Sequence, residues 1–278
     1  MTDPLAQVMA IVNRTPDSFY DKGATFALEQ ALRRCDEVIA QGATIVDVGG
    51  VKAGPGEDVS AAEEIDRVLP LVTAVAHRHP GVTVSVDTWR SDVADEAIRA
   101  GARLINDTWA GWDPELVEVA GHHRVGYVCS HTGGVTPRTR PHRVHFDDVV
   151  ADVIAETTAL ADKAVAAGVP EEQVLIDPTH DFGKNTFHGL ELLRRIDEVV
   201  ATGWPVLMAL SNKDFIGETL DRPVGDRVAG TLAATAWAAT RGVAAFRVHE
   251  VAETVDVIRM TAAMAGEAAP LNTVRGLA

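Results

Sequence analysis

The chain has 278 residues, of which 46% are hydrophobic, and its formal net charge is −15. This length fits one domain, and so acidic a chain argues against a nucleic-acid partner, which would need a basic face. No apolar run approaches the roughly 20 residues that cross a bilayer, and residues 1–13 lack the layout of a signal peptide. We therefore expect one cytoplasmic domain over residues 1–278, with a short tail from about residue 267 and no membrane partner.

Eight short apolar runs are typical of strands that are buried on both faces, as in a parallel sheet. In chain order they cover residues 7–13, 44–50, 83–88, 104–108, 126–131, 174–178, 205–211 and 244–249. Segments with helical periodicity lie between them, for example 27–41, 61–78 and 147–167. This alternation predicts a single-domain (β/α)8 TIM barrel. The main alternative is a doubly wound open sheet, but its GxGxxG loop after the first strand is missing.

Each predicted strand ends on polar residues. They are Asn13, Asp47, Asp87, Asn106 with Asp107, His131, Asp177, Ser211 with Lys213, and Arg247 with His249. Any one of them has a plain alternative role, as the cap of the next helix or the partner of a loop. Their recurrence in all eight units instead favours one site at the C-terminal rim, where (β/α)8 barrels carry their active sites.

The side chains after strands 3, 4, 6 and 7 suit a flat heterocycle. Asp87, Asn106 and Asp177 offer acceptor oxygens to ring N–H and NH2 donors, which need partners when they are buried. Lys213 can meet a ring carbonyl from the other side. This group therefore predicts a binding site for a fused-ring amide.

A second group indicates a phosphate. Asn13, Arg247 and His249 come from the first and last strands, which are neighbours in a closed barrel. Arginine and histidine beside an amide are typical of a phosphate site, and the loops after strands 7 and 8 commonly supply one. The expected ligand is thus a fused-ring amide that carries a phosphate or pyrophosphate.

Six segments at the predicted strand ends carry longer motifs. They are Asn13-Arg14-Thr15-Pro16-Asp17-Ser18-Phe19, Asp47-Val48-Gly49-Gly50, Ser85-Val86-Asp87-Thr88, Ile105-Asn106-Asp107, Leu175-Ile176-Asp177-Pro178 with Phe182-Gly183-Lys184, and Arg247-Val248-His249. In sequence and order they resemble the signatures of the dihydropteroate synthase family. The resemblance implies a pterin-binding barrel of folate biosynthesis. Such an enzyme joins 6-hydroxymethyl-7,8-dihydropterin pyrophosphate to p-aminobenzoate with Mg²⁺ and releases pyrophosphate.

The resemblance also implies roles for individual residues. The pterin ring would be bound by Asp87, Asn106, Asp177 and Lys213. The pyrophosphate would be held by Asn13, Arg247 and His249, with Asn13 helping to place Mg²⁺, a hard cation that favours oxygen ligands. Catalysis would involve Asp17, Lys213 and Arg247, with Asp17 closing over the site and stabilising positive charge on the pterin methylene.

The family resemblance further implies a homodimer formed through the last helices. The segment 228–240 is apolar around much of its circumference, and such a helix needs cover beyond the sheet. The apolar segment and the family resemblance thus both predict that the last helices form the dimer interface.

Three loops depart from the family pattern. After strand 2, Gly-Glu-Ser-Thr-Arg-Pro-Gly becomes Gly-Val-Lys-Ala-Gly-Pro-Gly over residues 50–56, although Lys52 can return one charge. After strand 6, Gly-Phe-Gly-Phe becomes Thr-His-Asp-Phe over residues 179–182. After strand 7, Ser-Arg-Lys-Ser becomes Ser-Asn-Lys-Asp over residues 211–214. The pterin group is therefore kept, while the acceptor side is changed.

Asp214 is the change with the clearest physical effect. Near the p-aminobenzoate carboxylate it would repel the acceptor by about 1–4 kcal/mol. Alternatively, it caps a helix over residues 215–220 and points away. The basic loop over residues 133–145 also has two interpretations, either steering an anionic substrate or lying solvated beside surface carboxylates.

Three functions follow from these observations. The first is an enzyme of the dihydropteroate synthase type that uses p-aminobenzoate or a different amine acceptor, with an authentic activity that the changed acceptor loops weaken or abolish. The second is an inactive pterin-binding protein with a regulatory or scaffolding role. The third is a pterin barrel that transfers a methyl group, which Arg247 and His249 disfavour because that reaction needs no pyrophosphate site.

Overall fold

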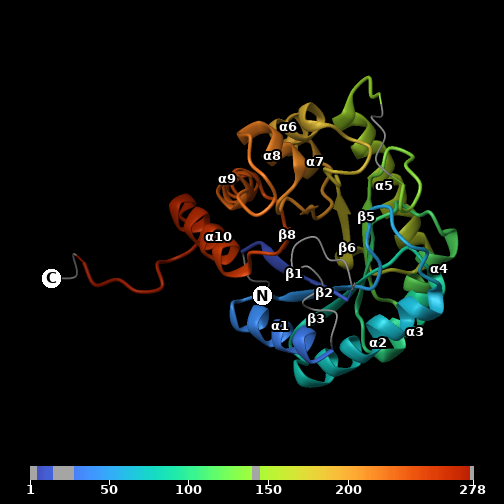
Figure 1. Ribbon diagram of the computed structural model, residues 1–278. Coiled ribbons are helices and arrows are strands. Elements are labelled where there is room, and N and C mark those ends of the chain that lie inside the picture. Colours follow the sequence, from blue (N-terminus) through green and yellow to red (C-terminus); the bar gives the residue numbers. More distant parts are fainter. Residues whose placement is uncertain (1–4, 15–27, 140–144, 276–278) are drawn as a thin grey trace.

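Eight parallel strands form a barrel in the computed structural model, which describes residues 5–14, 28–139 and 145–275 (Figure 1). The strands are β1 (Gln7–Asn13), β2 (Ile45–Gly49), β3 (Thr83–Asp87), β4 (Leu104–Asp107), β5 (Gly126–Ser130), β6 (Val174–Asp177), β7 (Leu207–Met208) and β8 (Ala245–Val248). They pair in the order β6-β5-β4-β3-β2-β1-β8-β7. A single bridge between Ile176 and Val206 brings β6 to β7 and nearly closes the barrel. The predicted (β/α)8 fold is confirmed.

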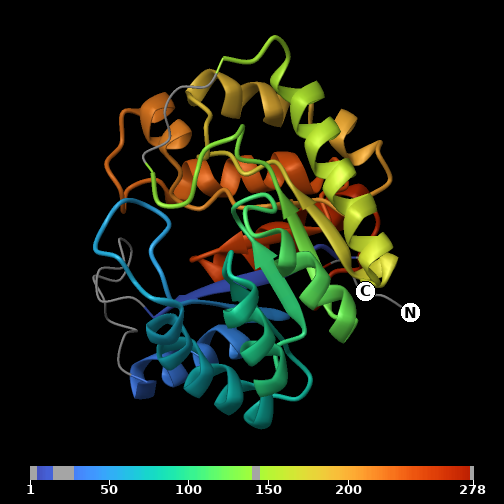
Figure 2. The same ribbon diagram turned by 90° about the vertical axis from the view of Figure 1, so that its right-hand side faces the viewer.

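The helices surround the strands, as two perpendicular views show (Figures 1 and 2). They are α1 (Leu28–Ala40), α2 (Ala61–Arg78), α3 (Ser91–Ala100), α4 (Pro114–His123), α5 (Val149–Ala167), α6 (Thr186–Arg194), α7 (Ile196–Val200), α8 (Asp214–Leu220), α9 (Val228–Ala239) and α10 (Val251–Ala265). A short 3₁₀ turn, Glu171–Gln173, precedes β6. None of the helices described is both long and apolar enough to cross a membrane.

Side-chain caps set where two helices begin. The hydroxyl of Ser60 accepts the N–H of Glu63 at 3.2 Å, so α2 begins at Ala61, as predicted. Asp148 accepts the N–H groups of Val150 and Ala151 at 2.9 and 3.1 Å. The helix predicted from residue 147 therefore begins at Val149, because Asp148 is its N-cap.

The seventh strand is much shorter than predicted. Residues 205–211 were expected to be extended, but regular pairing is limited to Leu207–Met208. Proline at position 205 has no N–H to donate, and Asn212 adopts a left-handed conformation with φ of 59°. The chain therefore leaves the barrel early, and the residues that follow form a loop at the rim.

A compact apolar layer fills the inside of the barrel. It consists of Met9, Ile45, Leu104, Val128, Leu207 and Ala245, which come from six strands. A larger apolar core lies between the strands and the surrounding helices. Both faces of the strands are thus buried, which explains why their sequences are almost continuously apolar.

The last described residues follow α10 and form no helix or strand. The helix ends at Ala265, and residues 266–275 lead away from the barrel (Figure 1). This change lies close to residue 267, where the sequence predicted a tail.

Candidate active site

A cavity of about 490 Å³ opens at the C-terminal ends of the strands. Its wall includes five of the predicted site residues, namely Asn13, Asp87, Lys213, Arg247 and His249. Lys52 from the loop after β2 and Asp181 from the loop after β6 also line it. Residues that are distant in the sequence thus meet at one rim, as expected of a (β/α)8 barrel.

Glycine at position 49 makes room for two of these side chains. Gly49 ends β2 and is paired with Asn13 of β1 and Asp87 of β3. A Cβ atom placed on Gly49 would lie 3.1 Å from Oδ1 of Asn13 and 3.7 Å from Cβ of Asp87. The missing side chain therefore allows the amide and the carboxylate to approach each other at the mouth of the barrel.

Arg247 of β8 forms ion pairs with two carboxylates across the barrel. Its Nε lies 2.6 Å from Oδ2 of Asp47, and its Nη2 lies 2.7 Å from Oδ2 of Asp87. Asp47 is fully buried and also accepts the hydroxyl of Ser85 at 2.6 Å. Burial raises the pKa of Asp87 to about 7; the charge of Arg247 lowers it, and that of Asp47 raises it.

The other two predicted pterin ligands lie outside the set of residues that line the cavity. Asn106 is fully buried and donates from Nδ2 to Oδ2 of Asp47 at 3.1 Å. Its Oδ1 is buried and has no hydrogen-bond partner among the described residues. Asp177, also buried, accepts the N–H of Thr179 at 2.7 Å, and burial raises its pKa. Two acceptor groups therefore lie in the interior near the mouth.

Lys213, the cation expected to meet a ring carbonyl, forms an ion pair within the protein. Nζ of Lys213 lies 3.2 Å from Oδ2 of Asp181, and both side chains line the cavity. Asp181 stands where the family motif has glycine. The sequence placed an acid at this rim but did not predict the ion pair, because the pair depends on the shapes of two loops.

A second lysine holds the loop after β6. Lys184 donates to the carbonyl oxygens of His131, Thr179 and Phe182 at 3.0 to 3.1 Å. Burial lowers the pKa of Lys184 to about 7. Its role in this structure is therefore to fix the backbone, while Lys213 and Lys52 are lysines that line the cavity.

His180, in the same loop, is buried against Phe215, with the ring centroids 5.3 Å apart. Neither of its ring nitrogens has a partner among the residues described. Burial lowers the pKa of His180 to about 3, so the ring is neutral near pH 7. The expected titratable group is present, but it packs as an apolar ring.

The changed Ser-Asn-Lys-Asp loop is fixed by two charged residues. Glu250 accepts the hydroxyl of Ser211 at 3.1 Å and the side-chain amide of Asn212 at 2.8 Å. Asp214, 77% exposed, lines the cavity and pairs with Arg227 at 2.8 Å. It is the first residue of α8 and not its N-cap, so the alternative interpretation of Asp214 as a helix cap was wrong. The N-cap position belongs to Lys213, whose extended backbone leads into the helix.

Two aromatic side chains of the cavity wall were not predicted as site residues. Trp109 and Phe182 meet edge to face, with centroids 4.6 Å apart. Both residues follow predicted strands in the sequence, and this position predicts that they lie at the rim. It does not predict that the two rings touch.

Part of the predicted site lies outside the described residues, including Asp17, Arg140, His142 and Arg143. Within the described part of the loop after β5, Arg138 donates to the carbonyl oxygen of Glu57 in the loop after β2. This contact joins two loops at the rim, while His145 at the end of the loop pairs with the exposed carboxylate of Asp147 at 3.7 Å, as the alternative of a surface loop expects.

A larger cavity of about 950 Å³ lies at the other end of the barrel, beside the first residues of the strands. Its wall includes Gln7, Thr83, Arg103 and Glu172. None of the predicted site residues is part of its wall. The smaller cavity is therefore the candidate active site.

Comparison with known proteins agrees with this geometry. A model of the pterin binding enzyme family matches residues 9–249. The chain is similar to dihydropteroate synthase of Bacillus subtilis, with 39% identity over 259 residues that cover 92% of this chain and 88% of the relative. The chain belongs to the dihydropteroate synthase family. Its fold matches the Yersinia pestis dihydropteroate synthase in a sulfonamide drug complex, with a TM-score of 0.88, 36% identity and 94% coverage of both chains.

A nearer relative within the dihydropteroate synthase family has a different description. The inactive dihydropteroate synthase 2 of Mycobacterium leprae is 58% identical over 275 residues, covering 98% of this chain and 94% of the relative. The chain therefore resembles both relatives named dihydropteroate synthase and relatives named inactive dihydropteroate synthase 2. The interpretation of this chain as a divergent member of the family is confirmed.

Proposed function

We propose that this protein binds 6-hydroxymethyl-7,8-dihydropterin pyrophosphate in the cavity at the rim but condenses it with p-aminobenzoate slowly or not at all. The observation that carries the proposal is the contrast between the two sides of the site. The groups expected to bind the pterin ring are present, whereas the acceptor loops contain Asn212 and Asp214 in place of arginine and serine. The similarity to a relative named as inactive supports the same conclusion.

In the proposed complex, the pterin ring is bound by Asp87, Asn106, Asp177 and Lys213. The buried Oδ1 of Asn106, which has no partner among the described residues, supports this assignment. A buried acceptor that lacks a donor costs about 1–3 kcal/mol, and a ring N–H or NH2 group would recover that energy.

The pyrophosphate side of the proposal involves Asn13, Arg247 and His249, all of which line the cavity. Arg247 is paired with Asp47 and Asp87, so it binds the ligand by exchanging or sharing those ion pairs. The amide oxygen of Asn13 fits a hard cation held chiefly by phosphate oxygens, and Mg²⁺ bound there would neutralise the pyrophosphate charge. Asp17, which lies outside the described residues, keeps its proposed catalytic role together with that of Lys213 and Arg247.

On the acceptor side, side chains already pair with one another. Arg227, which is not among the residues that line the cavity, pairs with Asp214. Asn212 is bonded to Glu250 and carries no charge. A cavity wall with Asp181 and Asp214 favours a neutral or cationic amine over p-aminobenzoate, so a transferase with a different amine acceptor is the second candidate function.

The first prediction separates binding from condensation. Isothermal titration should show binding of the pterin pyrophosphate in the presence of Mg²⁺, while pyrophosphate release should not increase on adding p-aminobenzoate. A panel of uncharged and cationic aryl amines tests the second candidate in the same assay. Dihydropteroate formation at about 1 per second or faster, an ordinary enzymatic rate, would contradict the proposal.

The second prediction concerns Asp181. Replacing it with glycine, the residue of the family motif, releases Lys213 from its ion pair for the ring carbonyl. Because the pair is partly exposed, its contribution is modest, and we expect the pterin pyrophosphate to bind roughly 3-fold to 30-fold more tightly. Titration of Asp181→Gly and Asp181→Asn measures the effect. Equal affinity in the parent and both variants would show that Asp181 does not compete with the pterin.

The proposal includes a homodimer, because apolar side chains remain exposed on the last two helices. Trp237 on α9 and Met260 and Met264 on α10 are large hydrophobic residues in this position. The two helices pack against each other, and a second copy would cover these exposed side chains. The expected cytoplasmic location belongs to the same proposal, since a charged pyrophosphate ester does not cross a membrane unaided.

A further inference from the structure

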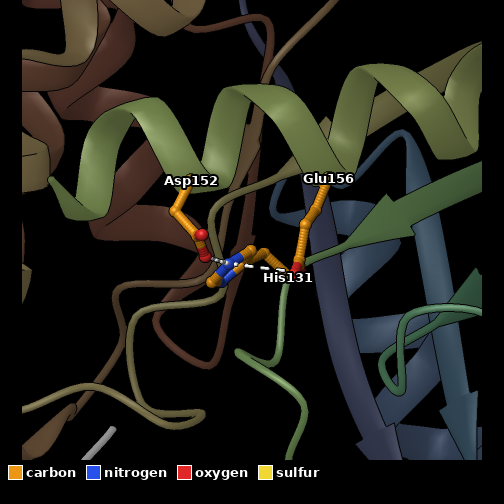
Figure 3. Close-up of side chains that lie close together, drawn as sticks. All are labelled: His131, Asp152 and Glu156. Atoms are coloured by element: carbon orange, nitrogen blue, oxygen red, sulfur yellow. Dashed lines mark hydrogen bonds and ion pairs between the residues drawn. The ribbon is translucent and has the colours of Figure 1, made fainter. Parts of the chain in front are cut away.

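Three potential metal ligands meet outside the cavity. His131 follows β5, while Asp152 and Glu156 lie about one turn apart on α5 and extend toward its ring (Figure 3). Nε2 of His131 is 2.9 Å from Oδ2 of Asp152 and 3.3 Å from Oε2 of Glu156. One imidazole nitrogen thus meets two carboxylates, although it can carry only one proton.

The cluster combines a buried base with an opening to solvent. The His131 side chain is fully buried, whereas those of Asp152 and Glu156 are 42% and 49% exposed. Nδ1 of His131 is buried and has no hydrogen-bond partner among the described residues. The two carboxylates favour a proton on Nε2, which a metal ion bound there would displace, and water can reach the two acids.

Both supporting elements are held in place. The N–H of His131 bonds to the carbonyl oxygen of Asp177 at 3.1 Å, and its own carbonyl oxygen accepts from Lys184 at 3.1 Å. The start of α5 is capped by Asp148, which also pairs with Arg195 at 2.9 Å. The three ligand atoms thus stand on elements that are fixed by contacts of their own.

The distances fit a small transition-metal ion. Zinc lies about 2.0–2.2 Å from histidine nitrogen and carboxylate oxygen, so two ligands of a tetrahedral site are about 3.3 Å apart. The three ligand atoms lie within 4.8 Å of one another, and water can take a fourth position. A nitrogen ligand disfavours Mg²⁺ and Ca²⁺, which prefer oxygen.

We propose that His131, Asp152 and Glu156 bind one divalent transition-metal ion of the Zn²⁺ type and thereby clamp α5 to the end of β5. None of the three residues lines the pterin cavity, so the site does not depend on the proposed pterin binding. Lys184 forms its hydrogen bonds to three carbonyl oxygens; its charge acts on Asp152 and Glu156, but neither carboxylate is hydrogen-bonded to it.

Titration of the full-length, chelator-treated protein with Zn²⁺ alone, in a phosphate-free buffer, tests this proposal. We expect one ion per chain, and roughly 10-fold to 100-fold weaker binding in Asp152→Asn and in Glu156→Gln. Asp162→Asn, an exposed acid on the same helix, is the matched control for charge and should bind like the parent. Excess Mg²⁺ should not displace the zinc.

Two further measurements locate the ion. Co²⁺ in the same site should give the visible absorption of a four-coordinate complex, and this absorption should be lost in Glu156→Gln. Anomalous scattering at the zinc edge should place one peak between the three side chains. Parent-like affinity in both acid variants, or a zinc peak elsewhere on the chain, would overturn the proposal.

Discussion

Restoring the acceptor loops, by Asn212→Arg and Asp214→Ser together with Ala53→Thr and Gly54→Arg, is expected to increase dihydropteroate formation by roughly 10-fold to 1000-fold. Replacing Asp214 removes a like charge, which costs about 1–4 kcal/mol near the acceptor carboxylate. Arg227, now its partner at 2.8 Å, keeps its hydrogen bonds to the carbonyl oxygens of Arg222 and Asn212. Energy gained at the acceptor raises turnover without changing pterin affinity.

The structure leaves space for these changes. A Cβ atom on Gly54 would have only Cε of Lys52 within contact range, at 3.8 Å. The arginine at position 212 must adopt the left-handed conformation of Asn212, at a cost of about 1–2 kcal/mol in stability. Glu250, which now bonds to the amide of Asn212, can pair with the new guanidinium.

The rate of pyrophosphate release with saturating p-aminobenzoate measures the gain. Each loop should first be changed alone, because substitutions around one site do not add simply. Asp226→Ser, at an exposed acid outside the cavity wall, is the control for Asp214→Ser. The variant with all four substitutions can bind the pterin pyrophosphate like the parent and still condense it no faster. That result would refute the explanation that the altered acceptor loops cause slow condensation.

Replacing Arg247 with methionine is expected to destabilise the ligand-free protein by about 3–5 kcal/mol. The change removes the guanidinium shared by Asp47 and Asp87 and leaves uncompensated carboxylates in the barrel. Breaking one side of a buried ion pair has this typical cost. The loss should exceed that of any exposed arginine, such as Arg259, whose replacement by methionine should change stability by less than about 0.5 kcal/mol.

The loss should depend on pH in a defined direction. Burial raises the pKa of Asp87 to about 7 even with Arg247 present, and removing the cation raises it further. Parent and variant both lose stability between about pH 4 and pH 7, because folded Asp87 keeps a proton that the unfolded chain releases. Above about pH 7 only the variant continues to lose stability in this way, so its deficit relative to the parent grows there. Urea unfolding at pH 5 and pH 8 measures this, and Asp87→Asn in the same chain should recover part of the loss at pH 8. A deficit under about 1 kcal/mol at pH 8 would argue against a role in folding for Arg247 and its ion pairs with Asp47 and Asp87.

The sequence predicted the barrel because its signal is local and repeated. Apolar runs ending in Asp87, Asn106 and Asp177 lie within one or two residues of the observed strand ends. Closure of the barrel then brings those ends to one rim without further information. Only the seventh strand departed strongly, because Pro205 and the left-handed Asn212 restrict its pairing.

The internal pairs of the site could not be predicted in the same way. The contact of Lys213 with Asp181 joins two loops, and that of Asp214 with Arg227 spans the length of α8. Asp47 was recognised as a polar strand end, but its ion pair with Arg247 connects residues 200 positions apart. Such contacts depend on side-chain direction and loop shape, which residue type does not specify.

The single bridge between Ile176 and Val206 has a consequence for how this barrel opens and how it diverges. With so few main-chain bonds, the seam between β6 and β7 is where local unfolding should begin, and amide hydrogens there should exchange earliest among the strands. The loops that carry Asp181 and Asp214 flank this seam. Substitutions in them disturb few ladder bonds, so the chain can exchange one acceptor chemistry for another while the other strands keep the same barrel.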